Sequence, residues 1–107
     1  MPIREISVTE LADVRDAGAV VVDVRNPAEH LEVRVPGVIL IPLPEFPDRA
    51  GEIPVADTVY VICRSGARSL KACEYLASQG RDAVNVAGGT LAWIDSGGDV
   101  ESGPDGA

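Results

Sequence analysis

Five short apolar runs recur along the chain, and turn residues or stretches of helical spacing separate them. The run at residues 19–24 is apolar almost throughout and does not alternate with polar residues. Such a pattern is typical of a strand covered on both faces, as in a parallel sheet. We expect strands at residues 3–6, 19–24, 38–41, 58–62 and 82–86.

Helices are expected between these strands, because apolar residues recur there at helical spacing and capping residues stand at the ends. Thr9 is expected to cap the first helix, which Gly18 ends. Asn26 and Pro27 are expected as the cap and first position of a short second helix. The expected helices span residues 9–17, 27–31, 45–49, 70–79 and 90–95. Strands that alternate with helices predict an α/β fold with a mainly parallel sheet.

The length of the chain, 107 residues, is enough for one domain with one core and too small for two. We expect this single domain over residues 1–98. Gly, Ser, Asp and Pro dominate the sequence beyond it. Residues 99–107 are therefore expected to form an acidic, mobile tail.

Charge and composition argue against several classes of function. The formal net charge of −8 disfavours nucleic acid as a partner, because a polyanion is bound by a basic face. No apolar stretch approaches the roughly 18 residues that span a bilayer, so we expect no membrane partner. The two cysteines form no disulfide framework, which favours a reducing, cytoplasmic setting.

The main candidate for chemistry is Cys63, which directly follows the expected strand at residues 58–62. A loop of small residues and a helix come next, which places the thiol at the bottom of a cup walled by backbone N–H groups. Such a site binds an anion and favours thiolate over thiol. Residues 63–71 also hold Arg64, Arg68 and Lys71 and no acidic residue. Cations at a helix N-terminus oppose the helix dipole, so we interpret this cluster as functional.

Four segments, in this order and spacing, resemble a single-domain rhodanese, a member of the sulfurtransferase family. They are VVDVRNPAE at residues 21–29, VPGVILIPL at 35–43, VICRSGARS at 61–69 and VAGGTLAW at 86–93. The resemblance implies a five-stranded parallel sheet in the order 1-5-4-2-3 with helices on both faces, and a persulfide carried on Cys63. Arg34 departs from the family pattern, which often has His before the Val-Pro-Gly turn, so no role is transferred from that histidine.

The loop from Cys63 to Arg68 has a C-x4-R spacing, one residue shorter than in cysteine-dependent phosphatases of similar sequence. A shorter loop closes more tightly and suits a terminal sulfur better than a tetrahedral phosphoryl group. Sulfur transfer is therefore favoured over a phosphatase or arsenate reductase. We expect a double displacement, in which Cys63 takes sulfur from thiosulfate or a similar small anion and passes it to a thiol or cyanide. We expect no cofactor and no metal ion.

The loop residues receive separate roles. Cys63 is the expected nucleophile, and the expected substrate-binding loop consists of Arg64, Ser65, Gly66, Ala67 and Arg68. Arg64 is expected at the mouth of the cup, where it meets the donor's sulfonate. Arg68 either does the same or braces the loop against a carboxylate. Gly66 supplies a backbone conformation that a side chain would forbid. Ser69 either offers its hydroxyl to the sulfur or caps the following helix, and capping is favoured.

Four further features, comprising six residues, have two interpretations each. Asp23 and Arg25 either support the loop or form a structural ion pair, which we favour. Cys73 is in helical phase with apolar residues and is expected to be buried rather than a resolving thiol. His30 is expected on the surface of a short helix rather than paired with Cys63. The Gly-Gly pair at residues 88–89 either lets the backbone approach the loop or makes a tight turn.

The sequence thus predicts a sulfurtransferase that acts on a small anionic sulfur donor. A second hypothesis is a sulfur-carrier module that docks protein donors and acceptors and has weak small-molecule turnover. The acidic outer surface suits a basic protein partner.

Overall fold

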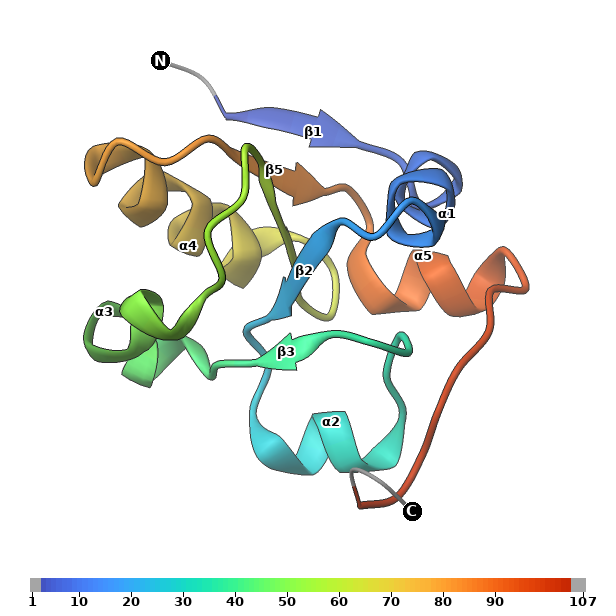
Figure 1. The fold of residues 1–107 in the computed structure, drawn as a ribbon. Coiled ribbons are helices and arrows are strands. Elements are labelled where there is room, and N and C mark those ends of the chain that lie inside the picture. Colours follow the sequence, from blue (N-terminus) through green and yellow to red (C-terminus); the bar gives the residue numbers. More distant parts are fainter. Residues whose placement is uncertain (1–2, 105–107) are drawn as a thin grey trace.

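One parallel sheet forms the centre of the protein in the computed structural model, which describes residues 3–104 (Figure 1). Its strands are β1 (Arg4–Ile6), β2 (Val20–Asp23), β3 (Ile39–Leu40), β4 (Val59–Ile62) and β5 (Ala83–Val86). They lie in the order β1-β5-β4-β2-β3, and each neighbouring pair is parallel. The predicted α/β fold and its strand order are confirmed.

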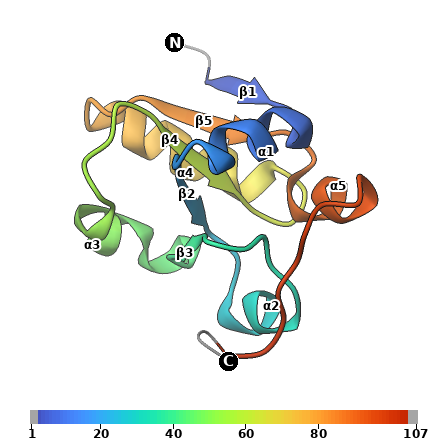
Figure 2. The same ribbon diagram turned by 45° about the vertical axis from the view of Figure 1, so that its right-hand side comes forward.

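Helices cover both faces of this sheet (Figure 2). They are α1 (Val8–Asp16), α2 (Pro27–Glu32), α3 (Phe46–Arg49), α4 (Ala67–Ser78) and α5 (Gly89–Asp95), with short 3-10 turns at Leu43–Glu45 and Ala50–Glu52. Leu11 of α1 and Trp93 of α5 pack on one face, and Phe46 of α3 and Leu76 of α4 pack on the other. None of the helices within residues 3–104 is long and apolar enough to cross a bilayer.

The central strand β4 leads directly into the loop that begins at Cys63. Its side chains alternate between the faces: Val59 and Val61 pack toward α4, and Ile62 packs toward α1 and α5. All three are fully buried. Burial of one such side chain contributes about 1.5–3 kcal/mol. The strand is therefore fixed from both sides, and it holds Cys63 at the carboxyl edge of the sheet.

The first helix begins earlier than its predicted cap. Ser7 is the N-cap of α1, and its hydroxyl accepts a hydrogen bond from the backbone N–H of Glu10 at 3.1 Å. The Glu10 carboxylate accepts the backbone N–H of Ser7 in return, at 3.2 Å. This reciprocal pair is a capping box. The prediction that Thr9 caps this helix is wrong, because the Ser-x-x-Glu pattern places the cap two residues upstream.

Helix α4 also begins earlier, at Ala67 instead of residue 70. Gly66 is its N-cap and has a φ of 116°, a conformation that side chains rarely adopt. The helix can therefore start immediately after the loop. As a result, Arg68 and Ser69 belong to its first turn, beside Cys63.

The segment after α5 returns to α2 (Figures 1 and 2). The indole N–H of Trp93 donates to the carbonyl of Asp99 at 2.6 Å, and Glu101 forms an isolated antiparallel bridge with Arg34. The sequence predicts a mobile tail here, whereas the structure shows residues 99–103 in contact with the domain. The last part of the predicted tail, residues 105–107, lies outside the described residues.

Candidate active site

The Cys63 sulfur is surrounded by donors from the loop that follows it. The backbone N–H of Gly66 donates to Sγ at 3.0 Å, and the hydroxyl of Ser69 donates to Sγ at 3.2 Å. The same hydroxyl lies 3.2 Å from the Gly66 carbonyl, and its single proton serves one acceptor at a time. The favoured interpretation of Ser69 as the helix cap is wrong, because Gly66 occupies that position.

These donors decide the ionisation of Cys63. Burial by itself raises the pKa of the thiol, since it disfavours the charged form. The Ser69 hydroxyl and the backbone N–H groups of Ser69, Gly66 and Ser65 act in the opposite direction and outweigh burial. The pKa of Cys63 is therefore lowered, and the thiolate is favoured. Cys63 itself is 1% exposed, so the cup is narrow.

Arg68 binds a carboxylate that the sequence analysis did not single out. Its two terminal nitrogens donate to the two oxygens of Glu29 at 2.7 and 2.9 Å. This bidentate hydrogen bonding lowers the pKa of Glu29 to about 2. Of the two roles left open for Arg68, the contacts correspond to bracing the loop. Glu29 also accepts the backbone N–H of Asn26, so it caps α2 as well.

Arg64 is exposed, and no ion pair engages its guanidinium within the described part of the chain. It lines a cleft of about 170 Å³ between α2 and α5, together with Glu32, Thr90, Leu91 and Ile94. Ser65 and Ala67 are exposed on the same loop. The loop therefore presents one cation to solvent at its rim.

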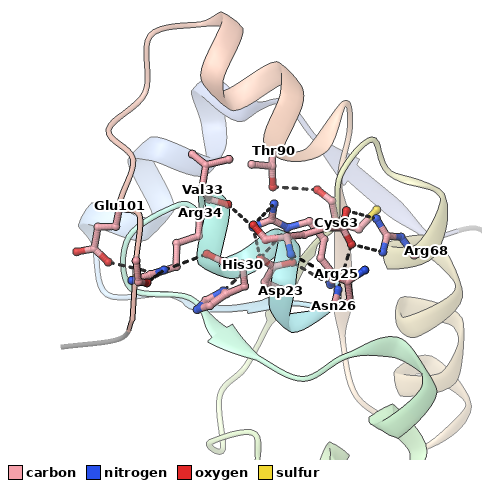
Figure 3. A network of polar contacts seen from close by, with 12 residues as sticks. Asp23, Arg25, Asn26, His30, Val33, Arg34, Cys63, Arg68, Thr90 and Glu101 are labelled. Carbon is pink, nitrogen blue, oxygen red and sulfur yellow. Dashed lines mark hydrogen bonds and ion pairs between the residues drawn. The ribbon is translucent and has the colours of Figure 1, made fainter. Parts of the chain in front are cut away.

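Asp23 and Arg25 form a buried ion pair behind the loop (Figure 3). Their closest N–O distance is 2.7 Å, and the residues are 1% and 3% exposed. Arg25 also donates to the carbonyl of Val33 at 2.7 Å and to that of Glu29 at 3.4 Å. The structure thus shows the ion pair that we favoured for Asp23 and Arg25 in the sequence analysis. The hydrogen bonds of this pair join α2 and Val33 to the end of β2, and none of them reaches the Cys63 sulfur.

His30 does not lie on the surface as predicted. It is 5% exposed, and its Nδ1 lies 3.7 Å from a carboxylate oxygen of Asp23. The prediction is wrong because α2 is covered on two sides, by the Asp23–Arg25 pair and by residues 101–103. The sequence of α2 by itself does not indicate that residues 101–103 cover its second side.

The N-terminus of α5 holds the backbone at Cys63. The Cys63 carbonyl accepts the backbone N–H of Thr90 at 2.8 Å and its hydroxyl at 3.0 Å. A Cβ on Gly89 would lie 2.5 Å from that carbonyl oxygen, which leaves no room for a side chain. Of the two interpretations of residues 88–89, close backbone approach is therefore correct at Gly89. Thr90 was missed because it contacts the main chain of a residue 27 positions away.

On the opposite side of the loop, Asn85 of β5 supports Gly66. Its side-chain amide donates to the Gly66 carbonyl at 3.1 Å and to the carboxylate of Glu5 at 2.8 Å. Cys73, in contrast, lies fully buried in α4, as predicted. Within residues 3–104, no group of three His, Cys, Asp or Glu side chains is placed to hold a metal ion.

A family model described as "Rhodanese-like domain" matches residues 7–96. The chain belongs to the rhodanese-like family of sulfurtransferases. This rhodanese-like domain is 43% identical over 88 residues to a protein of Allochromatium vinosum named "Sulfurtransferase", and the match covers 81% of this chain and 80% of that protein. The family membership is therefore shown by sequence as well as by fold.

Solved structures agree with this assignment. A rhodanese-related protein from Thermoplasma volcanium is similar with a TM-score of 0.85 and 33% identity, over 92% of this chain and 97% of that chain. A thiosulfate sulfurtransferase from Pseudomonas aeruginosa is similar with a TM-score of 0.85 and 26% identity, over 95% of this chain and 21% of that chain. The rhodanese-like domain thus spans about a fifth of the second protein.

Proposed function

We propose that this domain transfers sulfane sulfur from thiosulfate or a similar small anion to a thiol or cyanide, through a persulfide on Cys63. The observation that carries the proposal is the set of donors on Sγ, from Gly66 and Ser69, which lowers the pKa of Cys63 despite its burial. A thiolate in such a position is a nucleophile that needs no separate general base.

The reaction is a double displacement. The Cys63 thiolate attacks the outer sulfur of thiosulfate, a new S–S bond forms, and sulfite leaves with the electron pair of the broken S–S bond. The acceptor thiolate, or cyanide, then attacks the outer sulfur of the persulfide, and the Cys63 thiolate leaves with the electrons of that bond. The two steps balance without an external oxidant or reductant.

The loop residues have different roles, which follow from their charge and position. The Gly66 N–H and the Ser69 hydroxyl stabilise negative charge on sulfur, which is present before and after each transfer. Arg64 forms no ion pair among residues 3–104 and is exposed at the rim, so its guanidinium is available to bind the sulfonate of the donor. Arg68, held by Glu29, fixes the first turn of α4. Because Cys63 is 1% exposed, a small opening of residues 64–67 admits the donor's outer sulfur.

The length of the loop supports sulfur over phosphoryl chemistry. Four residues separate Cys63 from Arg68, and Gly66 already places its N–H within 3.0 Å of Sγ. We therefore expect the loop to close around one added sulfur atom. The Arg68 guanidinium, which would be needed to bind phosphoryl oxygens, is engaged by both oxygens of Glu29.

Mass spectrometry after incubation with thiosulfate tests the proposal. We expect the protein to gain about 32 Da, the mass of one sulfur atom, on the peptide that contains Cys63. Cyanide should remove this mass, and Cys63→Ser should not acquire it. No adduct on the wild-type protein, or an adduct on Cys73 alone, would contradict the proposal.

A sulfur-carrier module is the second candidate, and the surface beside the loop favours it. Leu91 and Ile94 lie next to Arg64 in the cleft and are 44% and 42% exposed. Exposed apolar side chains beside a reactive group suit a protein partner. The rates of sulfur loss from the persulfidated protein distinguish the two candidates. A carrier loses its sulfur only slowly to cyanide and much faster to a protein thiol, whereas the proposed enzyme turns over rapidly with cyanide.

A further inference from the structure

Arg34 is a buried cation that joins α2 to the segment after α5. It is 4% exposed, and its guanidinium donates to the carbonyls of His30 at 2.9 Å and Gly103 at 2.7 Å. Its Nε also lies 3.6 Å from the carboxylate of Glu101. A buried charge is tolerated when it is paired and hydrogen-bonded, and Arg34 meets both conditions.

We call residues 99–103 the strap. Its backbone binds the same end of α2: Arg34 and Glu101 exchange two backbone hydrogen bonds, of 2.9 and 3.0 Å. The Gly103 N–H donates to the Leu31 carbonyl at 2.7 Å. The last carbonyls of a helix have no partner inside the helix. The strap and Arg34 thus supply partners for the C-terminal end of α2.

The opposite side of α2 faces the Cys63 loop. Glu29 of α2 binds Arg68, which lies between Gly66 and Ser69, the two residues that donate to the Cys63 sulfur. Figure 3 shows the labelled side chains in order from Glu101 through Arg34 and His30 to Asp23, Arg25 and Arg68. A helix of six residues is marginal by itself, so its position depends on these outside contacts.

From this arrangement we infer that the strap positions α2, and that Arg34 is thereby a positioning residue for the reaction at Cys63. With α2 held at its C-terminal end, the Glu29 carboxylate stays where both of its oxygens meet Arg68. The inference rests on the proposed function for the reaction that it affects. The residue type matters, because a guanidinium reaches two carbonyls and a carboxylate at once, whereas an imidazole has at most two N–H donors.

A double-mutant cycle between Arg34→Met and Glu29→Gln tests the inference. With Glu29 present, we expect Arg34→Met to lower kcat/KM for thiosulfate about 10-fold, and Arg34→Lys, which keeps the charge and some donors, about 3-fold. With Gln at position 29, Arg34→Met should lower kcat/KM by less than about 2-fold. Amide hydrogen exchange should become faster in α2 and stay unchanged in α1.

Arg49→Met is the matched control. Arg49 of α3 binds Glu45 and Glu52, and within residues 3–104 no hydrogen bond or ion pair of its side chain reaches α2 or the strap. This variant should retain kcat/KM within about 2-fold of the wild-type value.

Three outcomes would overturn the inference. One is unchanged kcat/KM in Arg34→Met, another is an equal loss in both Glu29 backgrounds, and the third is unchanged exchange in α2. If Arg34→Met does not fold, the same double-mutant cycle with Glu29→Gln is measured for Arg34→Lys and for Glu101→Gln. A wild-type protein that acquires no persulfide would instead contradict the proposed function, so the two failures are distinguishable.

Discussion

Cys63 and Cys73 lie in the same hydrophobic core, but their pKa values are shifted in opposite directions. They are 1% and 0% exposed, and they belong to one cluster of buried residues. The pKa of Cys63 is nevertheless lowered, whereas the pKa of Cys73 is raised to about 12. Burial is therefore common to both and cannot be the reason for the difference.

The difference lies in the hydrogen-bond donors that reach each sulfur. Cys63 stands between a strand and a helix, where backbone N–H groups have no partner in a ladder and can point at the side chain. Cys73 lies inside α4, where backbone N–H groups are used by the helix. Burial is the largest cause of the raised pKa of Cys73, and the negative charges of Cys63, Glu5 and Glu74 raise this pKa further. A position just before a helix, rather than depth in the core, thus lowers the pKa of a buried cysteine.

Replacing each cysteine in turn is the strongest way to break this comparison. We expect thiosulfate:cyanide turnover to fall more than about 1000-fold in Cys63→Ser, because the nucleophile is lost. Cys73→Ala should retain turnover within about 2-fold, because Cys73 is buried inside α4 and is not the proposed nucleophile. Steady-state kinetics on both purified variants, with circular dichroism to confirm folding, measures the two effects. Comparable losses in both variants would show that the two thiols act together.

Ser69 sharpens the comparison, because its hydroxyl is the side-chain donor that Cys63 has and Cys73 lacks. Ser69→Ala should raise the pKa of Cys63 and so reduce the thiolate at a given pH by up to about 10-fold, since a hydrogen bond to a charged group is worth about 1.5–3 kcal/mol. Ultraviolet absorbance of the thiolate, followed against pH in a Cys73→Ala background, measures the shift.

The control for Ser69 is Ser78→Ala on the same helix. The Ser78 hydroxyl donates to the Tyr75 carbonyl at 2.6 Å and lies at the far end of α4. This substitution should leave the titration of Cys63 unchanged. An unchanged titration in Ser69→Ala would instead mean that the backbone donors alone lower the pKa.

The strand, loop and helix around Cys63 could be predicted because the information is local. The apolar run of β4, Cys63 and Gly66 lie within a few residues, and hydrophobic periodicity with a glycine is enough to place them. The order of the strands came from the resemblance and not from the periodicity. It is correct because parallel β–α–β topology leaves few ways to arrange five strands.

The rest of the site depends on side chains that meet across the fold. Glu29 fits the pattern of a helix cap, and nothing in its neighbours indicates that Arg68, 39 positions later, also binds it. The burial of His30 and the contacts of Arg34 require the strap, which a composition of Gly, Ser and Asp suggested to be mobile. Single-sequence patterns describe faces of elements, and they do not describe which charged groups meet when those elements pack.

The smallest expected effect concerns stability at alkaline pH, where Cys73 should destabilise the fold. Its pKa is about 12 in the folded protein, above the ordinary value of 9.0, so the folded state keeps a proton that the unfolded state loses first. The contribution of the thiol is complete below about pH 9 and is lost as the pH rises toward about 12. At pH 10 the loss in the free energy of unfolding should be about 1.4 kcal/mol.

Urea unfolding of wild-type protein and of Cys73→Ala, at pH 7 and at pH 10, measures this loss. The comparison isolates Cys73, because the other alkaline titrations, including that of Cys63, are shared by both proteins. An equal decline in both would mean that Cys73 reaches solvent and ionises without unfolding, which would contradict the contrast with Cys63.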